Sequence, residues 1–573
     1  MGVRGLETFL QKQVPNGAFP INILDEIDRM RSEHPDQPVV LVFQVVDLLY
    51  TIFLNLSSTE VVCGPDFKKI HKIFDDFLRQ LASSADELHF FMNEPAYHKD
   101  LKAWSKRESE QYLSRIAIMD KMDSNGFAEN KIKKEQGASA ALYDLLTICK
   151  AYGTVHTSID SKYIADIAKY SHEKNAMAIV GNNSHFLIFN GSWRYWSCRD
   201  IDLMKGNWTT LEFNKNALLE HVGLSWLQMP MFASILGNDF VPPGALYSFH
   251  KNIDDSLDGN KPLKLAEYVR LIPNIMTNDE KRDLLLDLFG SWEPRYFEML
   301  RDSLLFYAMK KEATEDEDPL LKLAASIGAV YYNSLKELPI RVKAPTFYDL
   351  RRTDVLPYYE IALPILKRQI GFVRNHKNDI NYQHVLELRL RHSESIRSMR
   401  VTPDYPSVEM PELMELTLNK NGDNYNDVRF ALLKWMVFGD DTLPQFEIQH
   451  IPKGYMVTVL SVMYLCKLKQ LSQLEANAIM LAIHFSDEHE EYTNGFAVPT
   501  NITARDVILL HLYIFVHNMM VKCFEFLGLS DFIDFLSIDG VYVVHWMNKM
   551  KTDGPDDETL SQIAYLRDFL RFI

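Results

Sequence analysis

The chain has 573 residues, of which 47% are hydrophobic and 24% are charged, proportions that are ordinary for a globular protein. At roughly 150 residues per domain, this length allows two to four domains. The 61 Lys and Arg residues and the 77 Asp and Glu residues give a formal net charge of −16. That balance argues against a protein that coats nucleic acid indiscriminately, so any site for a polyanion must be a local basic patch.

The cysteines and the apolar segments indicate in which cellular compartment the protein is expected. The five cysteines form no CxxC pair, which suits a reducing compartment and gives no zinc signature. The N-terminal MGVRGLETFLQKQ lacks the apolar region of a secretory signal. Residues 507–521 form the longest apolar segment, which is shorter than the ~20 residues that span a bilayer and predicts a buried core helix. We therefore expect a cytoplasmic protein without membrane contact, and a nuclear pool is compatible with the sequence.

Residues 1–250 alternate short apolar runs with helical stretches. The run VVLVFQVV, which starts at residue 39, predicts a strand buried on both faces that passes at Asp47 into a helix. Further strands are predicted at ELHFFM, TVHTS, AMAIVG and LIFNGS, with a helix near residues 65–82. Such alternation indicates an α/β fold with a parallel sheet flanked by helices. Ligands bind at the carboxyl ends of such strands, where Gln44 and Asp47 would lie.

The rest of the chain is predicted to be mostly helical. Residues 99–135 are rich in charge and read as a solvated helical excursion or partly ordered loop. We predict a first domain over residues 1–250, a helical extension with a basic segment over 251–400, a linker over 401–427 and an all-helical domain over 428–573.

Five sequence blocks carry a resemblance to a known family. They are MGVRGL at the start, residues 38–56, FFMNEPAYHKDLKAWSKRESEQ, AIVGNNSHFLIF and SILGNDFVPPGAL, and they follow one another as in the FEN/XPG-like structure-specific nucleases. Within that PIN-like superfamily, the short GNDFVPP phrase looks closest to the asteroid and constitutive-coactivator-of-PPAR-gamma group. The resemblance implies a PIN/FEN-like parallel sheet flanked by helices, followed by a mostly helical C-terminal region.

The resemblance also identifies the positions that hold metal in the nucleases. Those enzymes cluster Asp and Glu at strand ends to bind two divalent ions roughly 3.5 to 4 Å apart, since Mg²⁺ needs hard oxygen ligands. At these positions the chain has Gln44, Asn93, Ile159, Ser161, Asn183 and His185, and only Asp239 is retained. The amides keep size and hydrogen bonding but remove charge, which indicates a pseudonuclease without a metal cofactor. These residues also fit purely structural roles in the core or at helix caps.

An enzymatic alternative remains open. Asp47, Glu94 and Asp160 lie close to lost positions, and a register shift would let them join Asp239 in a rebuilt Mg or Mn site. The protein would then be a metal-dependent structure-specific nuclease. Against this alternative, VPPGALYSFHKNIDD lacks the glycine-rich turn with which the family's helix-hairpin-helix binds DNA phosphate.

Residues 341–400 carry 12 Lys or Arg against 6 Asp or Glu, a local net charge of +6, with aromatic residues interleaved. Basic side chains beside stacking aromatics are typical of single-stranded RNA binding. The other interpretation is that the aromatics are core residues and the charges a solvated helical face. The RNA-binding candidates are Arg351, Arg352, Lys367, Arg368, Arg374, Lys377, Arg389, Arg391, Tyr358 and Tyr359.

From these features we expect a catalytically inactive, RNA-associated scaffold in post-transcriptional regulation. Its partners would be RNA or RNA-binding proteins, with protein partners on the helical C-terminal region. The alternatives are the nuclease with a rebuilt acidic site and a protein-protein adaptor that does not bind RNA.

Overall fold

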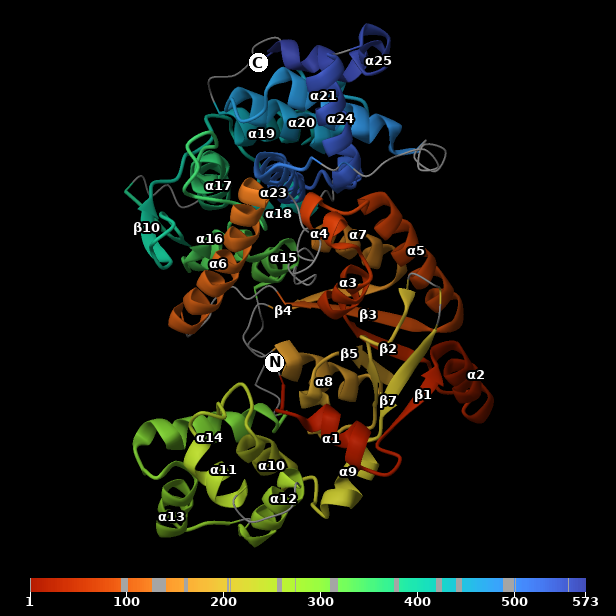
Figure 1. Ribbon diagram of the computed structural model, residues 1–573, viewed down its shortest axis with the longest axis vertical. Helices are drawn as coiled ribbons and strands as arrows, with labels where there is room; N and C mark the ends of the chain where they lie inside the picture. Colours follow the sequence, from red (N-terminus) through yellow and green to blue (C-terminus); the bar gives the residue numbers. More distant parts are fainter. Residues whose placement is uncertain are drawn as a thin grey trace.

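A seven-stranded sheet lies between two groups of helices in the computed structural model (Figure 1). Helices α10 to α14 lie at one end of the molecule, and the helices of the C-terminal region lie at the other. The structure describes residues 2–93, 101–125, 141–158, 163–203, 206, 208–254, 260–273, 275–309, 318–375, 381–418, 425–439, 446–487, 499, 501–554 and 556–572.

The sheet has the order β1-β7-β6-β5-β2-β3-β4. Strands β6, β5, β2, β3 and β4 run parallel, and β7 pairs antiparallel with both β6 and β1. The expected class, a parallel α/β sheet flanked by helices and followed by a mostly helical region, is therefore confirmed. The strands are β1 (Ala18–Asn22), β2 (Val40–Gln44), β3 (Glu87–Asn93), β4 (Thr154–Ser158), β5 (Ala178–Gly181), β6 (Arg194–Ser197) and β7 (Thr209–Phe213).

The helices that surround the sheet come from the whole length of the chain. In the first part they are α1 (Leu6–Gln13), α2 (Ile23–Glu33), α3 (Val45–Leu54), α4 (Ser58–Cys63), α5 (Phe67–Ser84), α6 (Leu101–Asn125), α7 (Leu142–Tyr152), α8 (Tyr163–Glu173), α9 (Lys215–Val222), α10 (Met229–Leu236), α11 (Tyr247–Asp254), α12 (Lys261–Leu271), α13 (Asn278–Phe289) and α14 (Pro294–Phe306). The remainder are α15 (Pro319–Ile327), α16 (Ala329–Lys336), α17 (Tyr358–Arg374), α18 (Leu413–Leu418), α19 (Asn426–Phe438), α20 (Met456–Lys467), α21 (Gln473–His484), α23 (Ala504–Phe526), α24 (Gly540–Asp553), α25 (Asp557–Gln562) and α26 (Ala564–Arg567).

Two hydrophobic cores meet at β2. Its five residues are all buried, and because strand side chains alternate, Leu41 and Phe43 enter one core while Val40 and Val42 enter the other. The first core continues through α3, α5 and α7 into the helices of the C-terminal region. The second contains α1, α8, α9 and the helices α10 to α14. The sheet and the C-terminal helices therefore share one continuous core.

The first core is closed by direct backbone contact between α4 and α24. Gly540 N donates to Gly64 O over 3.1 Å. A Cβ on Gly540 would lie 1.9 Å from the carbonyl oxygen of Cys63, so only glycine fits at the start of α24. The apolar segment near residue 510 forms α23, which by length and composition could cross a membrane, but 78% of its apolar window is buried in this core. The prediction of a buried core helix is confirmed.

Some local predictions were wrong. LIFNGS does not form a strand, because Asn183 caps a 3₁₀ turn, η4 (Ser184–Leu187), and the chain turns there. Strands β1, β6 and β7 were not predicted. For residues 99–135, the helical part of the prediction holds, since the described part is a long helix, α6; it is not wholly solvated, because Tyr112, Ile116 and Met119 recur at helical spacing and are buried.

The region expected to be a helical extension contains a second, three-stranded sheet of β8 (Ile340–Arg341), β9 (His384–Leu388) and β10 (Arg397–Val401). Residues 251–400 are also divided between the cores, since α12 to α14 pack in the second core and α15 to α17 in the first. The predicted linker, in its described part, is packed, because Leu413 and Leu416 of α18 are buried. The domain limits themselves stay a prediction.

Candidate functional site

The N-terminal segment closes the carboxyl edge of the parallel sheet. Val3 N donates to Ser184 Oγ over 2.8 Å, and Ser184 Oγ donates to Val3 O over 3.1 Å. A Cβ on Gly2 would lie 2.4 Å from Ser184 Oγ, so glycine permits this approach. Arg4 N donates to Gly237 O over 2.9 Å. The blocks MGVRGL, AIVGNNSHFLIF and SILGNDFVPPGAL thus meet in space.

Gln44 ends β2 at this edge and is 4% exposed. Its Oε1 atom is buried and has no hydrogen-bond partner among the described residues. The neighbouring Gly181 leaves room for it, since a Cβ on Gly181 would lie 2.1 Å from Gln44 Oε1. A carboxylate at this position would be a buried, uncompensated charge unless a cation accompanied it. The amide avoids that cost.

Asp47, in the first turn of α3, is half-buried and accepts a hydrogen bond from Asn182 N over 2.8 Å. The pKa of Asp47 is raised to about 6, mainly by burial and also by the nearby Glu7 carboxylate, although the hydrogen bond from Asn182 N and the charge of Arg199 act in the opposite direction. Glu7 accepts a hydrogen bond from Tyr195 Oη over 3.0 Å, and burial also raises the pKa of Glu7. Glu7 belongs to no motif in the sequence, and its only signal there is that it directly follows the MGVRGL block.

His185 and Asp239 form a second polar group at the edge. His185 is 1% exposed and contacts two polar groups. Its Nδ1 atom lies 2.6 Å from Tyr307 Oη, and its Nε2 atom lies 3.4 Å from Asp239 Oδ2. Burial alone would raise the pKa of Asp239, but the hydrogen bond with His185 and the charge of Arg107 on α6 lower it below its ordinary value. The carboxylate of Asp239 is therefore stabilised in its charged form by His185 and Arg107.

The other candidate positions do not complete a metal site in the described residues. Asn93 is exposed at the end of β3, and Asn183 accepts a hydrogen bond from His185 N over 3.1 Å. Nowhere in the described ranges do three or more His, Cys, Asp or Glu side chains come together in a way that could hold a metal ion. Four positions lie outside the described residues: Glu94, Ile159, Asp160 and Ser161.

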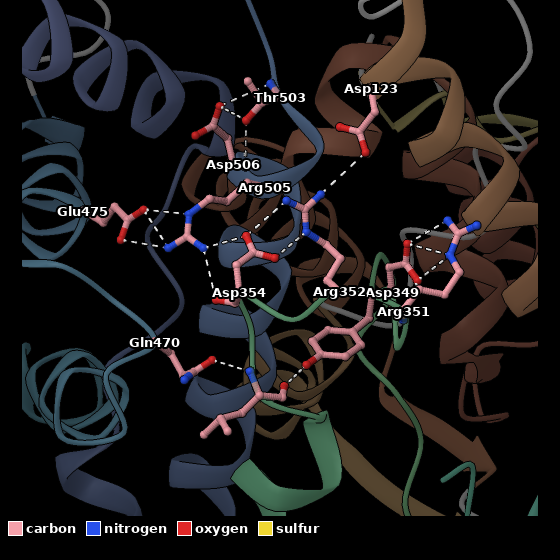
Figure 2. Close-up of polar contacts among 12 residues, drawn as sticks. Asp123, Asp349, Arg351, Arg352, Asp354, Gln470, Glu475, Thr503, Arg505 and Asp506 are labelled. Atoms are coloured by element: carbon pink, nitrogen blue, oxygen red, sulfur yellow. Dashed lines mark hydrogen bonds and ion pairs between the residues drawn. The ribbon is translucent and has the colours of Figure 1, made fainter. Parts of the chain in front are cut away.

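The described part of the basic segment does not form one free surface, because most of its candidate side chains pair with acids or pack in the fold, while RNA binding itself stays a prediction. Arg351 pairs with Asp349 at 2.7 Å and with Asp120 of α6, and Arg352 pairs with Asp354 at 2.8 Å and with Asp123 of α6 at 3.5 Å. Figure 2 shows how Asp354 is shared with Arg505 of α23, which also reaches Glu475 of α21. These ion pairs connect α6 to the C-terminal helices through residues 349–354.

Further candidates also serve the fold. Arg374, which is 3% exposed, pairs with Glu337 at 3.0 Å, and its guanidinium lies 3.4 Å from the ring centre of Tyr382. Tyr358 is buried, and its hydroxyl donates to backbone carbonyls. Arg389 is buried, and its guanidinium lies over the ring of Tyr112. Arg368 donates hydrogen bonds to the carbonyl oxygens of Met436 and Val437. Lys367 forms an ion pair with Asp404, and Tyr359 packs against the first core. Lys377 lies outside the described residues.

Arg391 differs from the other candidates because its side chain is 78% exposed. It shares the Glu394 carboxylate, at 3.8 Å, with Arg397, at 3.5 Å, and Arg397 is 62% exposed. Arg400, on the same strand as Arg397, is also exposed. The β9–β10 hairpin therefore keeps an excess of exposed positive charge.

Comparisons with known proteins agree with the resemblance. A model of the FAM120A-like domain matches residues 222–311. The chain is 23% identical over 299 residues to the constitutive coactivator of peroxisome proliferator-activated receptor gamma from Bos taurus, covering 50% of this chain and 41% of that protein. It is 22% identical over 300 residues to the Homo sapiens protein, covering 50% and 32%. The mouse constitutive coactivator of PPAR-gamma-like protein 1 is 21% identical over 258 residues, covering 44% and 23%.

The resemblance to the constitutive-coactivator group is thus confirmed for about half of this chain, and the matched part is less than half of each of these relatives. Among solved structures, the catalytic core of Rad2 in complex with DNA substrate is 14% identical, with a TM-score of 0.26, and the match covers 56% of this chain and 84% of that chain.

Changing Asp47→Asn tests the charge at the edge. The pKa of Asp47 is raised from 3.8 to about 6. Between pH 4 and pH 6 the Asp47 carboxyl is therefore protonated in the native state and ionised in the unfolded state. The free energy of unfolding falls as pH rises through this range, because deprotonation favours the unfolded state. The Asn side chain keeps an acceptor for Asn182 N. Denaturant unfolding should show the variant equal to wild type near pH 4 and more stable by about 2 kcal/mol at pH 7.

The control is Asp36→Asn, which removes an exposed carboxylate in the segment before β2; this variant should not show the gain in stability between pH 4 and pH 7 that is expected of Asp47→Asn. A stability difference between Asp47→Asn and wild type that is constant from pH 4 to pH 7 would contradict the assignment.

Proposed function

We propose that the chain is a non-catalytic scaffold in post-transcriptional regulation, built on a nuclease-like sheet that works without a bound metal. The observation that carries this proposal is the buried amide of Gln44 at the end of the central strand, where the resemblance places a metal-binding carboxylate. The relatives support it to the extent that they are named coactivators. A cytoplasmic location is part of the proposal.

The described acidic residues add support, because each is committed to a protein partner. Asp47 binds Asn182 N, Asp239 binds His185, and Glu7 binds Tyr195. Two-metal hydrolysis needs several carboxylates that face a common pair of ions. The alternative, a rebuilt Mg or Mn site, would need Glu94 and Asp160 to join Asp47 and Asp239.

A cleavage assay distinguishes these cases. Purified protein is incubated with flapped DNA and with structured RNA in Mg²⁺ or Mn²⁺, beside Asp239→Ala prepared in the same way. We expect both proteins to give the same background, because no metal-activated water forms. Cleavage by wild type that the Asp239→Ala change abolishes would overturn the non-catalytic assignment.

The second part of the proposal is that helices α10 to α14 bind a protein partner. Eight of the thirteen exposed large hydrophobic side chains in the described residues fall in residues 227–305, which coincide with the FAM120A-like match. Exposed apolar residues gathered on one unit mark interaction sites. The eight are Leu227, Tyr247, Leu271, Ile275, Leu286, Trp292, Phe297 and Leu305.

A triple change tests this surface. Leu271→Ser, Ile275→Ser and Trp292→Ser alter side chains that are 82%, 90% and 64% exposed, so each should change the free energy of unfolding by no more than about 0.5 kcal/mol. Proteins that wild type retains in an affinity pull-down should be lost by this variant. A matched triple change at exposed residues elsewhere, Leu54, Leu113 and Val408, should retain them. Equal loss in both variants would contradict the assignment.

RNA association is the second candidate function, and the exposed arginines of the β9–β10 hairpin favour it. Arg391 and Arg397 share one carboxylate, so the hairpin carries uncompensated positive charge, and β10 lies at the outer edge of the molecule (Figure 1). Such a surface attracts a phosphate backbone through the release of counterions.

Changing Arg391, Arg397 and Arg400 to Ser should weaken binding of single-stranded RNA. The slope of log affinity against log salt should fall by about 2, since each phosphate contact on a single strand contributes roughly 0.7. The matched control replaces Arg282, Arg295 and Arg301, which are exposed on α13 and α14. Fluorescence anisotropy over a salt series measures both. Equal slopes for wild type and the hairpin variant would exclude this surface.

A further inference from the structure

A cavity lies at the end of the sheet opposite the carboxyl edge. Its volume is about 410 Å³, and its walls come from residues 190–194, residues 212–216, His172 and Trp226. Residue 194 begins β6 and residue 213 ends β7, which runs antiparallel to β6. The carboxyl ends of β2, β5 and β6 therefore point away from this cavity, and none of the positions discussed above for metal binding lines it.

Lys215, the first residue of α9, places its amine in the wall of this cavity. The residue is 8% exposed, and Nζ donates to the carbonyl oxygen of Gly191 over 2.6 Å. Nζ lies 4.3 Å from the ring centre of Trp193 and 5.7 Å from that of Trp226. The amine thus lies close to two indole rings.

No carboxylate compensates this amine in the part of the chain that the structure describes. Glu212 also lines the cavity, but it accepts from Arg194 Nε over 2.7 Å and from Trp196 Nε1 over 3.1 Å, and Arg194 also binds Glu26. Burial lowers the pKa of Lys215 to about 7. The indole rings favour the ammonium form by about 0.5 to 2 kcal/mol, which opposes the effect of burial but is smaller.

A structural role alone does not explain this arrangement. Lysines that pack their stems against apolar surface keep the amine in water, whereas this amine is buried. An unpaired buried ammonium is costly, so a position that only filled space would favour an apolar side chain. A buried lysine with a neutral amine, open to a cavity, is the arrangement that makes an amine nucleophilic near pH 7.

The cavity indicates what such an amine would meet. Its volume falls in the range of small-molecule sites, which is roughly 300 to 1,000 Å³. Asn190, Ser192 and Asn216 give it polar walls. The lining suits a small polar molecule that carries hydroxyl groups.

We propose that Lys215 is a nucleophilic amine that binds small hydroxyaldehydes in this cavity as an imine. The nitrogen lone pair attacks the carbonyl carbon and forms a carbinolamine. The two hydrogens of the neutral amine and the carbonyl oxygen then leave as one water molecule as the C=N bond forms. No oxidant, reductant or metal is consumed. This site is independent of the scaffold function proposed above.

The test labels the full-length protein with glycolaldehyde at pH 7 in the presence of cyanoborohydride, which reduces the imine to a stable hydroxyethyl amine. Peptide mass spectrometry then follows each lysine over time. Lys215 should gain the hydroxyethyl group at least about tenfold faster than the exposed Lys12, because a far larger share of its amine is neutral. Its rate should rise with pH to a midpoint near 7; the other charged groups that line the cavity are His172, Arg194 and Glu212.

Two variants separate the cavity from the lysine alone. Trp226→Ala admits water to the amine, so labelling at Lys215 should fall toward the rate of Lys12, with the fold checked by circular dichroism. Lys215→Met removes the amine and leaves an uncharged side chain of similar length, so it should remove the fast-labelled peptide while other lysines react as before. Labelling of Lys215 at the rate of Lys12, or a fast rate unaffected by Trp226→Ala, would overturn the proposal.

Discussion

The central strand β2 imposes the constraint on which the rest of the structure depends. All five of its residues are buried, and they contribute alternately to two cores, one of which extends through the C-terminal helices. The strand ends at Gln44, beside Gly181, where there is no room for further side-chain atoms. A charge at that point would be desolvated on every side, so the strand end must either bind a cation or be neutral. In this chain it is neutral, and the neighbouring acids hold protein groups instead.

The C-terminal region is joined to the sheet domain by packing and by directed ion pairs. Gly540 brings α24 against α4 with no space between the backbones, and α23 contributes buried residues along most of its length. Around residues 349–354, arginines pair with carboxylates from α6 and from α21 (Figure 2). Ion pairs that are partly exposed add little stability singly. Their geometry instead fixes how these segments meet, so the local positive charge of this segment serves assembly more than it serves the surface.

The sequence predicted the parts of the fold that depend on local pattern. The continuous apolar runs of β2 and β5 and the apolar length of α23 identify buried elements without any tertiary information. The strands that were missed are short and mixed, and β1 contains Pro20, which local rules associate with edges and turns. The turn at Ser184 was missed because it depends on the side chain of Asn183.

In the candidate site, too, the features set by local sequence could be predicted, whereas the contacts between residues distant in sequence could not. The positions of Gln44, Asn183, His185 and Asp239 at one edge follow from the block order. The partners of the arginines do not, because Asp120, Asp123 and Asp404 are distant in sequence, and a count of charges in a window does not include them. Lys215 carries no motif at all, and its surroundings come from Trp193 and Trp226, which the topology of β6, β7 and α9 brings together.

The most direct test of the neutral strand end is the unfolding stability of wild type and Gln44→Glu, each measured at pH 7 with and without Mn²⁺. The two side chains have the same shape, and the change replaces the amide NH2 with a second carboxylate oxygen. We predict that Mn²⁺ leaves the stability of wild type unchanged and that Gln44→Glu lowers the free energy of unfolding by about 2 to 4 kcal/mol, the cost of an uncompensated buried charge. Stabilisation of wild type that increases with Mn²⁺ concentration would reveal a metal bound to the native state and contradict the account.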